Sequence, residues 1–271
     1  MTRTIGIIRY GFLTLSLIFF VFPLFWIFLS SFKAEEMMFE IPPIWFFKPN
    51  FDNYWSLITG GFRQNLLNSL IISSSSVAAS TFLAIPAAYA LARFDFKAKS
   101  NVTFYVASVQ MAPAFGFIVP YYILFRTMGF LDTLAAVATI YLTFNLGFAI
   151  WMLKGHIESV PNDLEESAMI DGCSRLGAIR RVVLPVIKPG LAATIMLMFA
   201  FSWNEFIYAF ILTSREAVTV TAAIAAQLGT FKILWTYMCA MSVVSIIPPL
   251  IVMYVAGKYI VAGLTLGGVK G

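Results

Sequence analysis

Charged side chains are scarce in this sequence: they make up 11% of its residues, against 60% for hydrophobic ones. A soluble domain of 271 residues needs a polar exterior that this composition cannot supply. The shortage of charge therefore excludes a water-soluble globular protein. The net charge of +5 comes without a run of basic residues, which argues against binding to nucleic acid.

Groups that carry catalysis or bind metals are also few. The chain has one histidine, His156, and two cysteines, Cys173 and Cys239, whose spacing fits neither a metal site nor a disulfide framework. No cluster of nucleophile, base or metal ligands lies in the apolar runs, which argues against a membrane enzyme. The chain also lacks the phosphate-binding loop G-x-x-x-x-G-K-S/T, so we expect no ATP hydrolysis, no metal ion and no cofactor in this chain itself.

Long runs without charge dominate the rest of the sequence. A helix needs about 20 mostly apolar residues to cross about 30 Å of hydrocarbon. Six runs meet this requirement: 10–32, 64–92, 100–125, 133–153, 189–214 (interrupted only by Glu205) and 233–257. We find neither a strand pattern nor an internal repeat. The sequence therefore predicts an all-α polytopic membrane protein, with six transmembrane helices in one domain that covers residues 1–271.

The positions of lysine and arginine predict the orientation. With the N-terminus inside, the segments on the cytoplasmic side hold 12 of these residues and the outer segments hold six. Positive residues favour the cytoplasmic side of a membrane. We therefore expect both termini in the cytoplasm. The outer segment 33–63 is predicted to be an ordered loop, because the prolines that it contains disfavour a helix.

Residues 154–188 form a polar segment between two apolar spans. Asn162 or Asp163 can cap a helix that begins there. Gly172 predicts the end of that helix, because glycine adopts the left-handed conformation that often follows a last helical turn. Apolar residues then recur at helical spacing, so we expect a second helix up to Leu184.

The spacing within this segment resembles a known motif. Glu166-Ser167-Ala168 is followed after three residues by Gly172, and after nine more by Val182-Val183-Leu184-Pro185. Permease subunits of binding-protein-dependent ABC importers carry a cytoplasmic "EAA" loop with this spacing, written E-A-A, three residues, G, nine residues, I-x-L-P. Ser167 in place of alanine and Val182 in place of isoleucine are small steric changes.

The resemblance covers nearly the whole chain and is greatest to the smaller permease of the maltose-transporter type. Four further stretches support it: Asn68-Ser69, 86–93, 203–206 and the tail 263–271. It implies a type I importer for a sugar or polyol in a bacterial or archaeal plasma membrane, also called the inner membrane. The implied partners are a second permease subunit, two ATP-binding subunits that hold ATP and Mg²⁺, and an extracytoplasmic solute-binding protein.

The resemblance also implies roles for particular residues. The first helix of the EAA loop would be a coupling helix, seated on an ATP-binding subunit. The residues implied in this coupling are Glu165, Glu166, Ser167, Ala168, Ile170, Asp171, Gly172, Leu184 and Pro185. The tail 267–271 is a second, weaker contact for the same subunits.

One acidic residue, Glu205, lies inside a predicted span, and such residues usually face a cavity or a partner. With Trp203, Asn204 and Tyr208 it could line a path for sugar. A structural hydrogen bond to the companion subunit is an equally good explanation. The serine stretch 73–76 is expected to serve helix packing, with a polar pore lining as the alternative.

A secondary transporter driven by ions or protons is the alternative function. Such proteins usually show internal repeats and broken helices around polar groups at the middle of the membrane. A single acid within the spans and no repeat argue against it. The sequence does not name the solute, and it leaves open whether this subunit contacts the solute.

Overall fold

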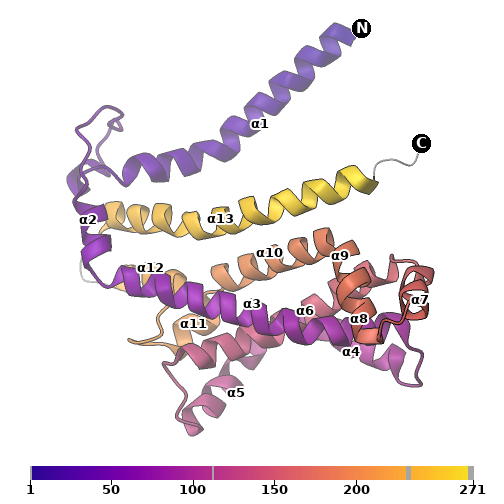
Figure 1. The fold of residues 1–271 in the computed structure, drawn as a ribbon. Coiled ribbons are helices and arrows are strands. Elements are labelled where there is room, and N and C mark those ends of the chain that lie inside the picture. The colour runs from indigo at the N-terminus through magenta and orange to yellow at the C-terminus, as the bar shows by residue number, and fades with distance from the viewer. Residues whose placement is uncertain (1, 112, 230–232, 268–271) are drawn as a thin grey trace. The chain divides into compact units, whose positions relative to one another are not determined.

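The computed structural model describes residues 2–111, 113–229 and 233–267, and the secondary structure in these ranges is helical without strands (Figure 1). The chain divides into two compact units. Unit 1 comprises Met1–Gln64 and Ala223–Ile247, and unit 2 comprises Asn65–Ala222 and Pro248–Gly271. The predicted all-α class is confirmed.

Four helices are long and apolar enough to cross a membrane: α1 (Thr2–Ser30), α3 (Phe62–Arg93), α6 (Leu134–Glu158) and α13 (Trp235–Gly267). Two bent pairs raise the number to six if each pair is one span. The first pair is α4 (Lys99–Met111) with α5 (Ala114–Thr127), and the second joins Arg175–Val186 to α10 (Lys188–Asn204). The described residues thus hold between four and six spans, and the six predicted from the sequence fall within this range.

Two of the predicted spans are not single helices. The span 100–125 is broken next to Pro113, where α4 and α5 meet at 94°. Pro113 has no N–H, and its extended backbone (φ −67°, ψ 125°) directly precedes the first turn of α5. The span 189–214 is also interrupted, because α10 ends at Asn204 and α11 (Ile207–Leu212) begins only after Glu205 and Phe206.

In unit 1, the segment 33–63, which was predicted to be an ordered loop, is partly helical. This segment includes a 3-10 turn, η1 (Glu35–Met37), and the helix α2 (Asp52–Thr59). The carboxylate of Glu35 accepts hydrogen bonds from the backbone N–H groups of Trp235 (2.8 Å) and Thr236 (3.0 Å). Glu35 therefore caps the N-terminus of α13 from a position 200 residues earlier in the chain.

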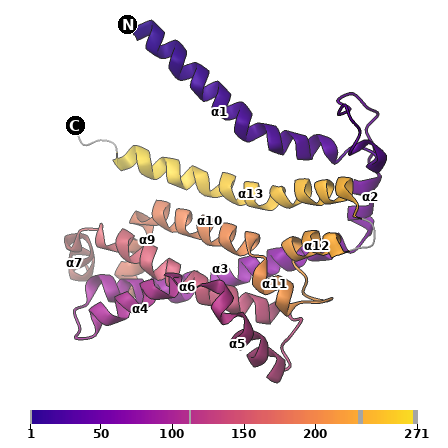
Figure 2. The same cartoon turned by 180° about the vertical axis from the view of Figure 1, so that it is seen from behind.

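In unit 2, α3, α6 and α10 lie side by side, and a polar contact joins all three (Figure 2). The buried Asn145 on α6 donates hydrogen bonds to Ser76 Oγ on α3 (3.0 Å) and Ser202 Oγ on α10 (2.8 Å). Side-chain hydrogen bonds between helices hold membrane bundles together, because lipid offers no alternative partner. The predicted packing role of the serine stretch is confirmed for Ser76.

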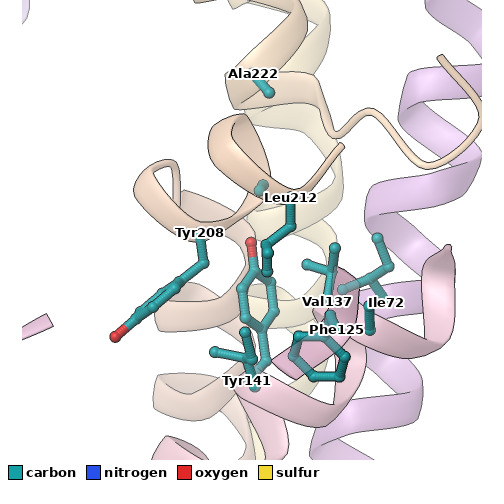
Figure 3. Close-up of a cluster of buried hydrophobic side chains, with 10 residues drawn as sticks. Ile72, Phe125, Val137, Tyr141, Tyr208, Leu212 and Ala222 are labelled. Atoms are coloured by element: carbon teal, nitrogen blue, oxygen red, sulfur yellow. The ribbon is translucent and has the colours of Figure 1, made fainter. Parts of the chain in front are cut away.

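A hydrophobic cluster lies at the end of unit 2 that carries α11 (Figure 3). It brings together side chains from α3, α5, α6, α11 and the first turn of α12 (Val220–Ala226). The residues labelled in Figure 3 are Ile72, Phe125, Val137, Tyr141, Tyr208, Leu212 and Ala222. The short helix α11 is thereby packed among the longer ones. α12 continues into a last 3-10 turn, η3 (Gln227–Gly229).

The close approach of α10 to α6 gives a test of this packing. A Cβ atom on Gly190 would lie 2.6 Å from three ring atoms of His156. We expect Gly190→Ala to lower the free energy of unfolding by about 1–3 kcal/mol, because overpacking forces neighbouring groups to move. Thermal unfolding of the purified protein measures this loss. His156→Ala should restore much of it in the double variant, and equal stability of Gly190→Ala and wild type would contradict the packing.

Candidate functional site

The polar segment between α6 and α10 folds as two short helices joined by a turn. Its first helix is α7 (Asn162–Ile170). Its second part consists of α8 (Arg175–Ala178), a π-helical stretch η2 (Ile179–Val183) and α9 (Leu184–Val186). We call residues 160–187 the helix–turn–helix segment. It lies at the end of unit 2 opposite α11 (Figure 1).

The turn between the two helices depends on Gly172. This residue has φ +90°, a backbone conformation that residues with a Cβ atom rarely adopt. The backbone N–H groups of Gly172 and Cys173 bond to the carbonyls of Met169 (3.1 Å) and Ala168 (3.0 Å), which closes the last turn of α7. The predicted end of the helix at Gly172 is confirmed.

The predicted start of α7 is wrong in one detail. The N-cap position is Pro161, and no side chain caps the helix there, so neither Asn162 nor Asp163 has the expected role. Proline disfavours the helical conformation of the residue before it, which is enough to separate α7 from α6. A side-chain cap is found instead on α8, where Ser174 Oγ accepts from the N–H of Gly177 at 3.2 Å.

The second helix does not stop before Pro185 as predicted. It continues to Val186, because the chain changes to π-helical geometry over Ile179–Val183. Pro185 has no N–H to offer to the fourth carbonyl before it, and a π-helical turn redistributes the bonds around such a gap. The helix then bends by 78° into α10.

The outer face of α7 carries several of the residues predicted to contact a partner. Ile170 is 86% exposed although it is apolar. Glu166, Ser167, Asp171 and Gly172 are exposed as well. Of the other predicted coupling residues, Pro185 is exposed, whereas Ala168 and Leu184 are half-buried. The turn therefore presents one apolar side chain surrounded by polar groups.

Glu165 differs from this set, because it is 3% exposed and faces the interior of unit 2. Its carboxylate accepts hydrogen bonds from the hydroxyl of Tyr89 and from Nε of Arg93, each at 2.7 Å. Arg93 also donates to the carbonyl oxygen of Val160 at 2.8 Å. Sequence reasoning did not assign a role to Tyr89 or Arg93. The sequence showed only that a basic residue, Arg93, follows a predicted span, and it did not indicate which acidic residue would bind it.

A second feature is a cavity of about 200 Å³ within unit 2. It lies where α10 is interrupted, and its wall combines aromatic rings with polar groups. Its lining residues are Tyr141, Phe144, Asn145, Phe201, Ser202, Glu205 and Tyr208. Rings and hydrogen-bonding groups together are typical of sites for small polar ligands.

Of the four residues predicted to line a path for sugar, Glu205 and Tyr208 line this cavity. Trp203 is buried and stacks on Phe199, with ring centroids 5.6 Å apart. Asn204 is exposed, and its side chain donates to the carbonyl of Ala200 on its own helix at 2.8 Å. The remaining lining residues lie mainly on α6, which the sequence did not relate to residues 203–208.

Glu205 is bound within the chain. Its carboxylate accepts hydrogen bonds from the backbone N–H groups of Tyr208 (3.0 Å) and Ala209 (3.3 Å) and from the hydroxyl of Tyr141 (2.8 Å). Its carbonyl oxygen accepts from the hydroxyl of Thr221 at 2.7 Å. The side chain therefore caps α11 and supports the break in the helix.

Asp132, at the same end of unit 2, was not predicted as a site residue. Its carboxylate accepts hydrogen bonds from four successive backbone N–H groups, those of residues 214–217, at distances of 2.9–3.2 Å. Burial opposes ionisation, but these backbone bonds outweigh it and lower the pKa of Asp132 from 3.8 to about 2. We call this arrangement the Asp132 clamp. It fixes the loop that follows α11.

Comparison with known proteins bears on the whole chain. Residues 80–265 match the sequence profile described as "Binding-protein-dependent transport system inner membrane component". The chain belongs to this family. The permease is 33% identical to the sulfoquinovosyl glycerol transport system permease protein SmoH of Agrobacterium fabrum, over 93% of this chain and 89% of that protein. It is also 33% identical to the trehalose/maltose transport system permease protein MalG of Thermococcus litoralis, over 93% and 92%.

A solved structure has the same fold. It is described as a bacterial ABC transporter involved in the import of the acidic polysaccharide alginate, and one of its chains superposes with a TM-score of 0.78 over 95% of this chain and 96% of that chain. The two sequences are 23% identical, so this likeness concerns the fold. The family itself is that of the permeases of sugar ABC importers, and the predicted resemblance is confirmed.

The Asp132 clamp predicts a dependence of stability on pH. A carboxylate whose folded pKa is lowered stabilises the folded state above its unfolded pKa, and this contribution is lost as the pH falls towards the folded value. At neutral pH we expect Asp132→Asn to lower the free energy of unfolding by about 1.5–2 kcal/mol. This is the low part of the range for hydrogen bonds to a charged group, because the site is partly exposed.

Thermal unfolding measured from about pH 5 to about pH 2 tests this expectation. The wild-type permease should lose stability over this range, and Asp132→Asn should lack that part of the loss. Glu216→Gln is the matched control, because Glu216 is exposed and only its backbone N–H enters the clamp. A wild-type profile that Asp132→Asn reproduces would refute the clamp.

Proposed function

We propose that the permease forms one half of the translocation path of an importer for a sugar or polyol, and that α7 couples it to a separate ATP-binding subunit. The exposed turn of α7 carries this proposal. Ile170 is held out by the turn at Gly172, beside the charge of Glu166, and together they offer an apolar contact with a polar rim. Protein interfaces typically have an apolar centre surrounded by a polar rim.

The proposed partners follow from the family. They are a second permease subunit, two ATP-binding subunits that hold ATP and Mg²⁺, and an extracytoplasmic solute-binding protein. A related importer was solved in complex with an alginate pentasaccharide-bound periplasmic protein, which supports the last of these partners. Closure of the ATP-binding subunits would move α7 and shift the spans between two states. The chain would hydrolyse no ATP itself.

We further propose that the helix–turn–helix segment faces the cytoplasm and that both termini lie on that side. The end of unit 2 that holds this segment is rich in basic residues, among them Arg93, Lys97, Lys99 and Lys154. Positive residues next to spans favour the cytoplasmic side. The Asp132 clamp then lies on the outer side, where a solute-binding protein would dock.

The cavity at the interruption of α10 is our proposed contact with the solute in this subunit. Phe201 exposes 55% of its surface beside this cavity, and an aromatic face suits the apolar face of a sugar ring. Glu205 would act here through the shape of the break, since α11 and Tyr141 already occupy its carboxylate. A secondary transporter driven by ions is less well supported, because Glu205 is engaged in these bonds.

The turn at Gly172 gives the first test of coupling. We expect Gly172→Val to abolish import, because a β-branched residue at φ +90° is strained by about 1–3 kcal/mol and redirects the turn. Import is measured in proteoliposomes that contain the complete importer. Affinity of the solute-binding protein for its sugar should not change.

Gly172→Asn is the matched control, because asparagine tolerates positive φ better than other residues with a side chain. It should retain more import than Gly172→Val. If Gly172→Val imports at the wild-type rate, α7 has no coupling role.

The cavity gives a separate test. We expect Phe201→Ala to lower the import rate by about two- to twelvefold, which corresponds to the loss of one aromatic contact of about 0.5–1.5 kcal/mol. Phe210 on α11 is similarly exposed, at 49%, but does not line the cavity, so Phe210→Ala is the control. Equal losses in both variants would argue against solute contact at this cavity.

A further inference from the structure

Both carboxylate oxygens of Glu165 accept hydrogen bonds from side chains at the C-terminal end of α3. One carboxylate oxygen accepts from Arg93 and the other from Tyr89, and the side chains of Arg93 and Glu165 are 11% and 5% exposed. Arg93 also donates a hydrogen bond to the carbonyl oxygen of Val160, just before α7 begins. The last two turns of α3 therefore bind α7 both at its entrance and at its first turn. Because charge-assisted hydrogen bonds are short and directional, they restrict the angle between the two helices.

A second contact ties the other helix of the segment to the same place. The guanidinium of Arg175 on α8 lies 4.7 Å from the centroid of the Phe94 ring. That ring meets the ring of Tyr89 edge to face, with centroids 6.2 Å apart. Residues 89–94 thus contact both α7 and α8. Both short helices are attached to the end of one long span.

Without these contacts, α7 would have freedom to pivot. Only Ser159, Val160 and Pro161 separate it from α6, and no side chain caps its first turn. Buried ion pairs are also poor devices for stability alone, because the cost of removing both charges from water can exceed their attraction. An apolar contact would bury the same surface at lower cost. The arrangement is better explained by the fixed geometry that it imposes.

We propose that Arg93 and Glu165 are positioning residues that join α7 rigidly to α3, so that any displacement of α7 is passed to this span. Tyr89 completes the joint by holding the second oxygen of Glu165. The inference rests on the proposed coupling role of α7, and it adds the route by which the motion leaves that helix. We call the three side chains the α3–α7 joint.

The joint is tested by comparing ATP hydrolysis with import in the complete importer, reconstituted in proteoliposomes. Glu165→Gln keeps the size of the side chain and removes its charge. We expect ATP-binding subunits to remain bound and hydrolysis to stay near the wild-type rate, while import falls about tenfold, within the usual range of coupling effects. Each imported molecule would then cost more ATP.

Glu158→Gln is the matched control. It breaks the exposed ion pair between Glu158 and Lys154 (2.7 Å), which lies at the same end of unit 2 and outside the joint. It should leave both rates unchanged. If Glu165→Gln lowers hydrolysis and import in the same proportion, the pair is only structural and the proposal fails. Tyr89→Phe, which removes one hydrogen bond and no charge, serves the same comparison if Glu165→Gln does not fold.

A distance measurement tests rigidity directly in the otherwise intact importer. Spin labels are attached at position 95, just after α3, and at position 162, the first residue of α7. The native cysteines Cys173 and Cys239 are replaced by serine so that they are not labelled. The side chains of Asp95 and Asn162 are both exposed. We expect the same narrow distance distribution with and without ATP, and a broader one in Glu165→Gln. A change of this distance on ATP binding in the otherwise wild-type protein would overturn the proposal.

Ile170→Asp separates failure of the joint from failure of the proposed function. Loss of the ATP-binding subunits during purification of this variant supports docking on α7. If Ile170→Asp leaves them bound and import normal, the docking role fails, and the joint loses its premise. If docking is lost in Ile170→Asp but the ratio of hydrolysis to import is normal in Glu165→Gln, the joint alone is refuted.

Discussion

An unpaired backbone N–H or carbonyl group in apolar surroundings costs free energy, and this constraint explains the positions of three acidic residues of the permease. At three places where a helix begins or the chain turns near the end of a span, a carboxylate supplies the missing acceptor. Glu35 caps α13 within unit 1, while in unit 2 Glu205 caps α11 and Asp132 binds the loop after it. Each of these acids binds backbone N–H groups, so each shapes the chain at its own position.

Glu165 differs from these three acids in its partners. Its carboxylate is bound by side chains, those of Arg93 and Tyr89, and therefore joins two helices instead of capping one. The neighbouring Glu166 is exposed. Successive residues of a helix point about 100° apart, so one of two adjacent glutamates can be held inside while the other faces a partner. In the proposed coupling, the two neighbouring glutamates would thus have different tasks.

The sequence predicted the helices well and their interruptions less well. The turn at Gly172 could be predicted, because glycine is the residue type that favours a backbone conformation with positive φ. A proline within an apolar run indicates a kink, but it does not tell whether the helix breaks, as next to Pro113, or continues, as α3 does at Pro86. The π-helical turn before Pro185 was missed. The partners of Glu165 and Glu205 lie on other helices, 72 and 64 residues earlier in the chain, and a local pattern holds no information on such contacts. The cavity was therefore found only in part.

The geometry of α10 relates the two ends of unit 2. This helix begins immediately after the 78° bend that follows Pro185, and it ends at the break where Phe201, Ser202 and Glu205 line the cavity. Its 17 residues span about 25 Å at 1.5 Å per residue. Beside the cavity, Asn145 bonds to both α3 and α10, so these two helices share an anchor on α6. A displacement that enters at the helix–turn–helix segment would thus act on α3 through the joint and on α10 through the bend, and both helices lead towards the cavity end. Under this proposal the interruption at Glu205 would have a physical use, because a continuous α10 would carry the displacement past the cavity, whereas a break would allow the cavity wall to change shape.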